Sequence, residues 1–159
     1  MTTLTHTQGI VLTKRDWAEA DRLYAVFTKA HGKLELLGRG ARKPLAKLAP
    51  HLEFAAEADL LIVHGKTMET IAGVERQQLF PGIYEDMQKT LLTHQAFQLV
   101  DAGTKPKQAD TALYHLLHAW LVFLDAAPPM LTQERSAFLF GSFTWQFLSL
   151  LGHAPQLLF

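Results

Sequence analysis

The clearest strand signal in the chain reads Lys33-Leu34-Glu35-Leu36-Leu37-Gly38, in which polar and apolar residues alternate. This alternation is typical of a strand with one buried face. Outward from it, short runs at 8–13, 23–28, 54–63 and 67–74 predict four more strands, separated by turn residues. Because no helix intervenes between neighbouring strands, the five strands indicate a small antiparallel barrel or a sandwich.

The second half of the chain changes to a helical period. Apolar residues recur three and four apart over 83–100 and again over 113–124, and a third helix is expected over 132–152, with Thr132 as its N-cap. We therefore expect an α+β protein, with a strand-rich domain over 1–79 and a small helical bundle over 80–159.

Composition excludes several classes of protein. The 159 residues are 48% hydrophobic and 19% charged, which is too apolar for a disordered chain. There is no cysteine, which excludes a disulfide scaffold and a thiolate zinc site. No apolar run reaches the roughly 20 residues of a membrane span, and the N-terminus lacks the pattern of a signal peptide. We expect a cytoplasmic protein with no membrane partner.

The formal net charge of zero hides a division along the chain. Fifteen Lys plus Arg oppose fifteen Asp plus Glu. Residues 1–52 contain nine basic and four acidic residues, a net charge of +5, and the remainder carries the compensating −5. Such asymmetry between halves suggests that the basic half meets nucleic acid.

The basic residues gather on the strand at 33–38 and on the loop after it, which contains Gly and Pro. The candidate DNA contacts are Lys33, Arg39, Arg42, Lys43 and Lys47. A basic groove on a small barrel can follow the backbone of single-stranded DNA, with salt-sensitive affinity. Trp17, in a polar stretch, is the candidate for stacking on a base. The alternative is a solvated charged surface, and composition alone does not separate the two.

Patterns that would indicate catalysis or a metal are weak. His115 and His118 lie three residues apart on one expected helical face, but no third ligand has a fixed spacing to them. No phosphate-binding loop, nucleophile elbow or zinc-protease motif occurs. We predict no catalytic residues, no metal, no cofactor and no enzymatic activity. An enzyme that uses the two histidines is the least favoured alternative.

The third expected helix is apolar around most of its circumference. Such a helix is normally buried, and core packing is the favoured interpretation for most of its residues. An exposed apolar patch would instead mark a partner site. In that alternative the chain is a protein-interaction adaptor, and its candidate partner contacts are Arg135, Phe143 and Phe147.

Several short motifs occur in a specific order along the chain. They read Gly9-Ile10-Val11-Leu12, Glu19-Ala20-Asp21-Arg22-Leu23, Val26-Phe27-Thr28, His31-Gly32-Lys33, Arg39-Gly40-Ala41-Arg42, Phe80-Pro81-Gly82 and Leu150-Leu151-Gly152-His153-Ala154-Pro155-Gln156-Leu157. In this order they resemble the RecO family of bacterial recombination mediators over nearly the whole chain. The resemblance implies an N-terminal OB-fold barrel followed by a helical domain. It places Lys33, Arg39 and Arg42 in the family's basic strand-and-loop motif, which Lys43 and Lys47 continue.

The resemblance also implies a function and partners. Members of the family bind single-stranded and double-stranded DNA, anneal complementary strands, and bind the acidic tail of single-stranded DNA-binding protein. With RecR they help to load RecA onto gapped DNA. The chain is thus expected to be a DNA repair and recombination mediator, cytoplasmic and nucleoid-associated, that makes and breaks no covalent bond.

Two features depart from the family pattern. Family members continue beyond the Pro-Gln-Leu motif, often into a segment with zinc-binding cysteines. The chain is therefore expected to be a shortened or an incomplete member, and zinc is not carried over. The family's third helix has Arg before and Glu after a Phe, whereas this chain reads Gly141-Ser142-Phe143-Thr144. Without that Arg, the contact with an acidic tail is weakened, because Arg135 is the only basic residue on this helix.

Overall fold

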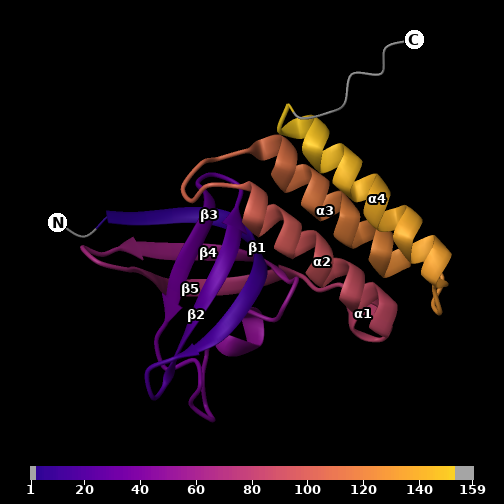
Figure 1. Cartoon of the computed structure of the whole chain (residues 1–159). Helices are drawn as coiled ribbons and strands as arrows, with labels where there is room; N and C mark the ends of the chain where they lie inside the picture. The colour runs from indigo at the N-terminus through magenta and orange to yellow at the C-terminus, as the bar shows by residue number, and fades with distance from the viewer. Residues whose placement is uncertain (1–2, 153–159) are drawn as a thin grey trace. The chain divides into compact units, whose positions relative to one another are not determined.

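The computed structural model describes residues 3–152 (Figure 1). Five strands come first, with a short 3-10 helix after the third: β1 (Thr3–Trp17), β2 (Asp21–Thr28), β3 (Gly32–Gly38), η1 (Ala49–His51), β4 (Glu57–His64) and β5 (Glu69–Gln78). Four helices follow: α1 (Pro81–Tyr84), α2 (Met87–Gly103), α3 (Thr111–Ala126) and α4 (Gln133–Leu150). The predicted α+β class, with five strands before the helices, is confirmed. Residues 153–157 of the C-terminal motif lie outside the described residues.

β1 is much longer than the run at 8–13 that predicted it, because it pairs with two strands. Its first part, Thr3–Ile10, pairs antiparallel with β4, and its second part, Gly9–Trp17, pairs antiparallel with β2. The pairing with β2 shifts between Val11 and Thr13. A shift of this kind is a β-bulge, which bends the strand and lets one strand serve two neighbours.

The sheet closes on itself in the order β1-β2-β3-β5-β4. All neighbouring pairs are antiparallel except β3 and β5, which pair in parallel through Leu36 with Glu69 and Leu37 with Thr70. A closed sheet has no free edge. The strand-rich part is therefore a barrel, and the sandwich alternative does not apply.

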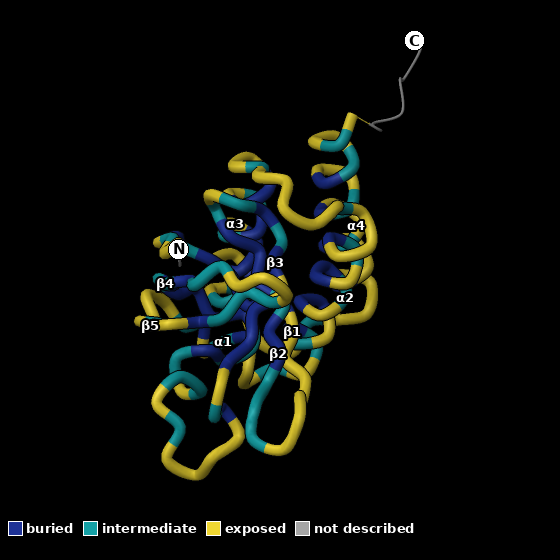
Figure 2. The backbone as a smooth tube through the Cα atoms, turned by 90° about the vertical axis from the view of Figure 1, so that its left-hand side faces the viewer, coloured by how far each residue is buried: buried dark blue, intermediate teal, exposed yellow. Residues whose placement is uncertain are grey.

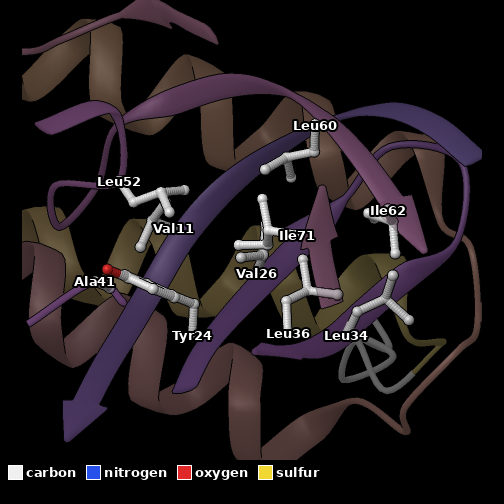
Figure 3. Packing of buried hydrophobic residues seen from close by; sticks show 10 residues of the cluster. All are labelled: Val11, Tyr24, Val26, Leu34, Leu36, Ala41, Leu52, Leu60, Ile62 and Ile71. Carbon is white, nitrogen blue, oxygen red and sulfur yellow. The ribbon is translucent and has the colours of Figure 1, made fainter. Parts of the chain in front are cut away.

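A cluster of buried apolar side chains fills the barrel (Figure 3). It draws on all five strands and on the segment between β3 and β4: Val11, Tyr24, Val26, Leu34, Leu36, Ala41, Leu52, Leu60, Ile62 and Ile71. Tyr24 is fully buried, and this burial raises the pKa of its hydroxyl, although the Arg22 guanidinium offsets part of the rise. Ala41 and Leu52 bring both ends of the segment after β3 into the core (Figure 3). Figure 2 shows the buried stretches of backbone in dark blue, mostly within strands and helices, and the loops mostly exposed.

The described residues form two compact units. The first holds the described residues up to Leu79 together with Lys105–Asp110, and the second holds the remainder. Lys105–Asp110 lies against β3, where the Lys107 N–H donates to the carbonyl oxygen of Lys33 at 3.0 Å. This short segment between α2 and α3 is therefore part of the strand-bearing unit.

In the helical unit, side chains cap the starts of two helices. The Asp86 carboxylate accepts hydrogen bonds from the Met130 N–H at 2.7 Å and from the Lys89 N–H at 3.1 Å. These two bonds, with Met130 contributing most, hold the pKa of Asp86 below its usual value. Thr132 accepts from the Arg135 N–H at 3.1 Å and caps α4, as predicted. None of the helices between residues 3 and 152 has the length and apolar character needed to cross a membrane.

Candidate nucleic-acid interface

The loop between β3 and η1 carries four cations and no acid. Residues 39–52 contain Arg39, Arg42, Lys43 and Lys47, which we call the loop cations, and neither Asp nor Glu. All four are exposed. Like charges gathered on one loop repel one another, so this loop gains from an anionic ligand that neutralises them.

The loop begins from a fixed point on the barrel. At Gly38, which ends β3, an added Cβ atom would lie 2.7 Å from the ring of Tyr24, so a larger residue does not fit. Gly40 has a φ of +69°, and its N–H donates to the Asp21 carboxylate at 2.8 Å. Ala41 is buried in the barrel core. These contacts set the direction in which the loop leaves β3.

Arg42 ties the loop to the turn between β1 and β2. Its guanidinium donates to the carbonyl oxygen of Ala18 at 2.8 Å, and its backbone N–H donates to Ala20 at 3.0 Å. Its Nε also lies 3.6 Å from the Asp16 carboxylate, which pairs with Arg22 as well. Arg42 therefore positions the loop, and only part of its charge remains for a ligand.

Arg39, Lys43 and Lys47 differ from Arg42. Their side chains make no hydrogen bond or ion pair with any residue between 3 and 152. Because nothing in this part of the chain neutralises them, their charges are available to phosphate groups. A phosphate backbone is neutralised by surface Lys and Arg of this kind, with release of its counterions.

Trp17 lies beside this loop. It is the last residue of β1, it is 41% exposed, and the Arg15 guanidinium lies 5.7 Å from the centre of its ring. The next residue, Ala18, accepts the hydrogen bond from Arg42. The structure thus brings Trp17 and the loop cations to one end of the barrel, where both connections extend beyond the strands (Figure 1).

Lys33 lies away from the other candidate contacts. It is at the start of β3, paired with Phe27, whereas the loop cations follow the end of the same strand. Gly38 lies five residue steps along the extended strand from Lys33, a span of about 17 Å. The neighbours of Lys33 are instead in Lys105–Asp110, through the hydrogen bond from Lys107 and a bridge with Pro106.

The three candidate partner contacts on α4 lie in different environments: Arg135 is exposed, and the two phenylalanines are buried. Arg135 is exposed, with its guanidinium 5.9 Å from the ring of Phe138. Phe143 and Phe147 are each 1% exposed, and the ring of Phe143 lies 5.0 Å from that of Trp120. The expectation of a partner contact through Phe143 and Phe147 is therefore corrected, because both side chains pack in the interior of the helical unit.

The exposed aromatic side chains of α4 are different ones. Phe138 is 67% exposed and Trp145 is 47% exposed. A groove of about 260 Å³ runs between α3 and α4, lined in part by Phe123 and Gln146. The apolar composition of α4 was visible in the sequence, but only the packing separates its outward residues from its inward ones.

The histidines do not form a metal site in the described part of the chain. His115 is exposed beside Tyr114, and His118 lies half-buried against Phe80. No three His, Asp or Glu side chains between residues 3 and 152 are close enough to share a metal ion.

Sequence reasoning missed the groups that hold the basic loop and surround Trp17. Asp21 and the carbonyl groups of Ala18 and Ala20 anchor it, and Arg15 covers one side of Trp17. The sequence did offer one indication of these anchors, namely the acidic residues within the otherwise basic N-terminal half. An acid among cations is a candidate anchor for one of them.

Comparison with known proteins identifies relatives of this chain. The family described as "Recombination protein O N terminal" matches residues 1–80. The DNA repair protein RecO of Moorella thermoacetica is 31% identical over 150 residues, which cover 94% of this chain and 54% of the relative. That of Pelobacter propionicus is 32% identical over 152 residues, covering 94% and 59%.

A third relative shows the same coverage. The DNA repair protein RecO of Desulfitobacterium hafniense (strain DSM 10664 / DCB-2) is 25% identical over 152 residues, covering 96% of this chain and 53% of the relative. The chain thus spans about half the length of the curated relatives it matches. Since the family match takes in the whole barrel and the loop that carries its cations, the chain belongs to the RecO family.

Proposed function

We propose that the chain is a DNA repair and recombination mediator that holds single-stranded and duplex DNA on the loop after β3. The observation that carries the proposal is the set of three exposed cations, Arg39, Lys43 and Lys47, on a loop without acids that is anchored to the barrel. The names of its relatives, which are DNA repair proteins, support the same role.

The proposal includes the OB-fold for the five-stranded barrel. OB-folds bind oligonucleotides through the face of their second and third strands and through the loops that join strands 1–2 and 4–5. Here Trp17 borders the β1–β2 turn and Lys33 lies on β3. A DNA strand that contacts the loop cations at one end of β3 would reach Lys33 about 17 Å away, roughly three nucleotides further at an extended spacing.

Binding by these residues is electrostatic and tolerant of sequence. Phosphate contacts carry no sequence information. In this mechanism Arg39, Lys43, Lys47 and Lys33 contact phosphates, Arg42 positions the loop and adds a partial charge, and Trp17 stacks on a base. No covalent bond is made or broken, so the chain acts by holding strands and not as an enzyme.

The helical unit is proposed to serve the partners that the family implies. These are RecR and the acidic tail of single-stranded DNA-binding protein, with RecA loading and strand annealing as the outcome. Arg135, in the first turn of α4, is the cation available to an acidic tail on that helix. Such a role would be carried out at the nucleoid.

The proposal is tested by titrating the chain with labelled single-stranded and duplex oligonucleotides at several salt concentrations. We expect binding to both, with a slope of log K against log salt of about −3 for single strands, from four phosphate contacts at about 0.7 each. Annealing of two complementary oligonucleotides should be faster in its presence. Affinity that does not change with salt would contradict the proposal.

A second candidate is a protein-interaction adaptor that does not bind DNA. The exposure of Phe138 and Trp145 on α4 favours it. In that case the salt titration shows no binding to either oligonucleotide. Replacing Phe138 and Trp145 by Ala would then weaken capture of RecR or of a synthetic acidic tail peptide. The same double variant leaves DNA binding unchanged if the mediator proposal is right.

A further inference from the structure

An exposed leucine lies at the tip of the basic loop. Leu45 is 93% exposed, between Lys43 and Lys47 in the chain. It occupies the third position of a turn closed by a hydrogen bond of 3.0 Å from the Ala46 N–H to the carbonyl oxygen of Lys43. Pro44, in the second position, fixes the backbone as a turn requires. Leu does not stabilise the third position of a turn, where Gly, Asn or Asp is favoured.

The other apolar residues around this turn face inward. Ala41 and Leu52 are buried in the barrel core, and Leu48 and Ala49 pack against it. The segment is thus held by packing on both sides of the turn, while Leu45 is left outside. Leu45 is instead presented to solvent on a short, closed turn.

We propose that Leu45 is an apolar wedge that contacts the faces of nucleic acid bases while the loop cations hold the adjacent phosphates. This inference rests on the proposed function and adds to it the part of the DNA that the loop tip recognises. Proteins that bend or open nucleic acids insert Leu, Met or Pro between neighbouring bases in this way.

The surroundings of Leu45 favour bases over the other apolar partners. A nucleotide presents a phosphate and an apolar ring face within one repeat, which matches a Leu with Lys43 and Lys47 close on either side. Trp17 at the same end of the barrel offers a second surface for stacking. A lipid surface is normally bound by a broad apolar helix face and not by one side chain.

A wedge has a consequence for strand pairing. A base that unstacks from its neighbour can pack its ring face against Leu45. Its hydrogen-bonding edge then stays exposed, because Leu45 contacts only the face of the ring. Strands held in this way are ready to meet a complementary strand. The wedge would therefore speed annealing beyond what neutralisation of phosphate charge achieves.

The test uses a single-stranded oligonucleotide that contains 2-aminopurine, a base whose fluorescence rises when it is unstacked. The full chain is compared with Leu45→Ala, with Leu45→Met, and with Leu4→Ala as the matched control. Leu4 is also exposed, at 58%, and lies near the start of β1, where β1 pairs with β4 and not with β2. All four proteins are checked for equal thermal stability.

We expect a fluorescence rise with the unchanged chain and with Leu4→Ala. Leu45→Ala should give less than about half of that rise, with the same salt slope, because the phosphate contacts remain. Leu45→Met should retain it, since Met is also an apolar wedge and has no aromatic ring to stack on the probe.

A full rise with Leu45→Ala would overturn the wedge and leave the proposed function standing, provided that salt-dependent binding is intact. Loss of binding to anionic vesicles by Leu45→Ala, with unchanged fluorescence on DNA, would assign the leucine to a lipid surface and would also overturn the wedge. Absence of DNA binding by the unchanged chain would overturn both proposals.

Discussion

The guanidinium of Arg42 donates a hydrogen bond of 2.8 Å to the carbonyl oxygen of Ala18, 24 residues earlier in the chain. This bond joins the loop after β3 to the turn between β1 and β2. Arg42 therefore anchors the loop, whereas Arg39, Lys43 and Lys47 are exposed and can contact a ligand. The division between an anchoring cation and ligand-facing cations underlies the predictions about the interface.

Replacement of Arg42 by Ala should loosen the loop. An exposed charge-assisted hydrogen bond of this kind contributes on the order of 1 kcal/mol, so local opening should become about fivefold more frequent. Limited trypsin digestion, followed by mass spectrometry, should show faster cleavage after Lys47. Arg15→Ala is the matched control, because Arg15 pairs with Glu35 and does not hold the loop. Equal cleavage rates in Arg42→Ala and the unchanged chain would refute the anchoring role.

Two glycines with similar backbones should respond differently to Ala. Gly32 and Gly40 have φ values of +70° and +69°. At Gly32 an added Cβ would lie 2.1 Å from the backbone oxygen of Gln108, whereas at Gly40 the nearest atom is 3.6 Å away, in the Lys43 side chain. We expect Gly40→Ala to cost about 1 kcal/mol from backbone strain. Gly32→Ala should cost more than about 2 kcal/mol, because Lys105–Asp110 must also move.

Urea denaturation measures both costs. Hydrogen exchange of the Lys107 N–H, which bonds to Lys33, reports on the same displacement. It should be faster in Gly32→Ala only. Equal destabilisation by the two variants would mean that the segment does not pack against β3 as described.

The cap at Asp86 should make stability depend on pH. In the folded chain the pKa of Asp86 is below the roughly 3.9 of an unfolded Asp. The stabilisation of the fold by the Asp86 carboxylate is therefore complete above about pH 3.9, and it is lost as the pH falls through the folded pKa. Asp86→Ala should cost about 1 kcal/mol at pH 7. The difference from the unchanged chain should narrow below about pH 4.

Thr132→Ala is the control for this cap. It removes the cap of α4, which does not titrate, so its cost should stay constant with pH. Thermal unfolding from pH 3 to pH 7 compares the two variants. A constant difference for Asp86→Ala would show that its hydrogen bonds do not depend on its charge.

The buried position of Phe147 can be tested through two glycines of the helical unit. At Gly103 an added Cβ would lie 2.7 Å from the Phe147 ring, whereas at Gly141 no atom lies within 4 Å. Gly103→Ala should therefore destabilise the chain by about 1–3 kcal/mol through overpacking. Gly141→Ala should stabilise it by about 0.5–1 kcal/mol, because Ala is the better helix former. Thermal unfolding gives both values, and stabilisation by Gly103→Ala would contradict the packing of Phe147.

The strands show what the sequence could and could not predict. Alternation along Lys33–Gly38 identified β3, because one face of that strand is buried in the barrel. The C-terminal end of β1 was missed, since residues 14–17 are exposed and show no alternation of buried and exposed side chains, although they pair with β2. A hydrophobic pattern reports burial of side chains and not pairing of backbones.

The candidate site divides in a similar way. The loop cations were recognisable from local charge, because no acid lies among them. The anchoring bond from Arg42 to Ala18 joins positions far apart in the chain, and it could not be derived without the register of β1 and β2. On α4, Phe143 and Phe138 are equally apolar in the sequence, and only contact with Trp120 shows that Phe143 faces inward.

The salt dependence of DNA binding by Arg39→Ala/Lys43→Ala tests the account most directly. The control is Arg135→Ala, which removes a cation from an exposed position on α4, outside the strands and loops of the barrel. The loop variant should bind single-stranded DNA more weakly, with a salt slope about 1.4 smaller in magnitude, from two lost phosphate contacts at about 0.7 each. The control should keep the slope of the unchanged chain. An unchanged slope in the loop variant, or an equal loss in the control, would contradict the assignment of the loop as the DNA-binding surface.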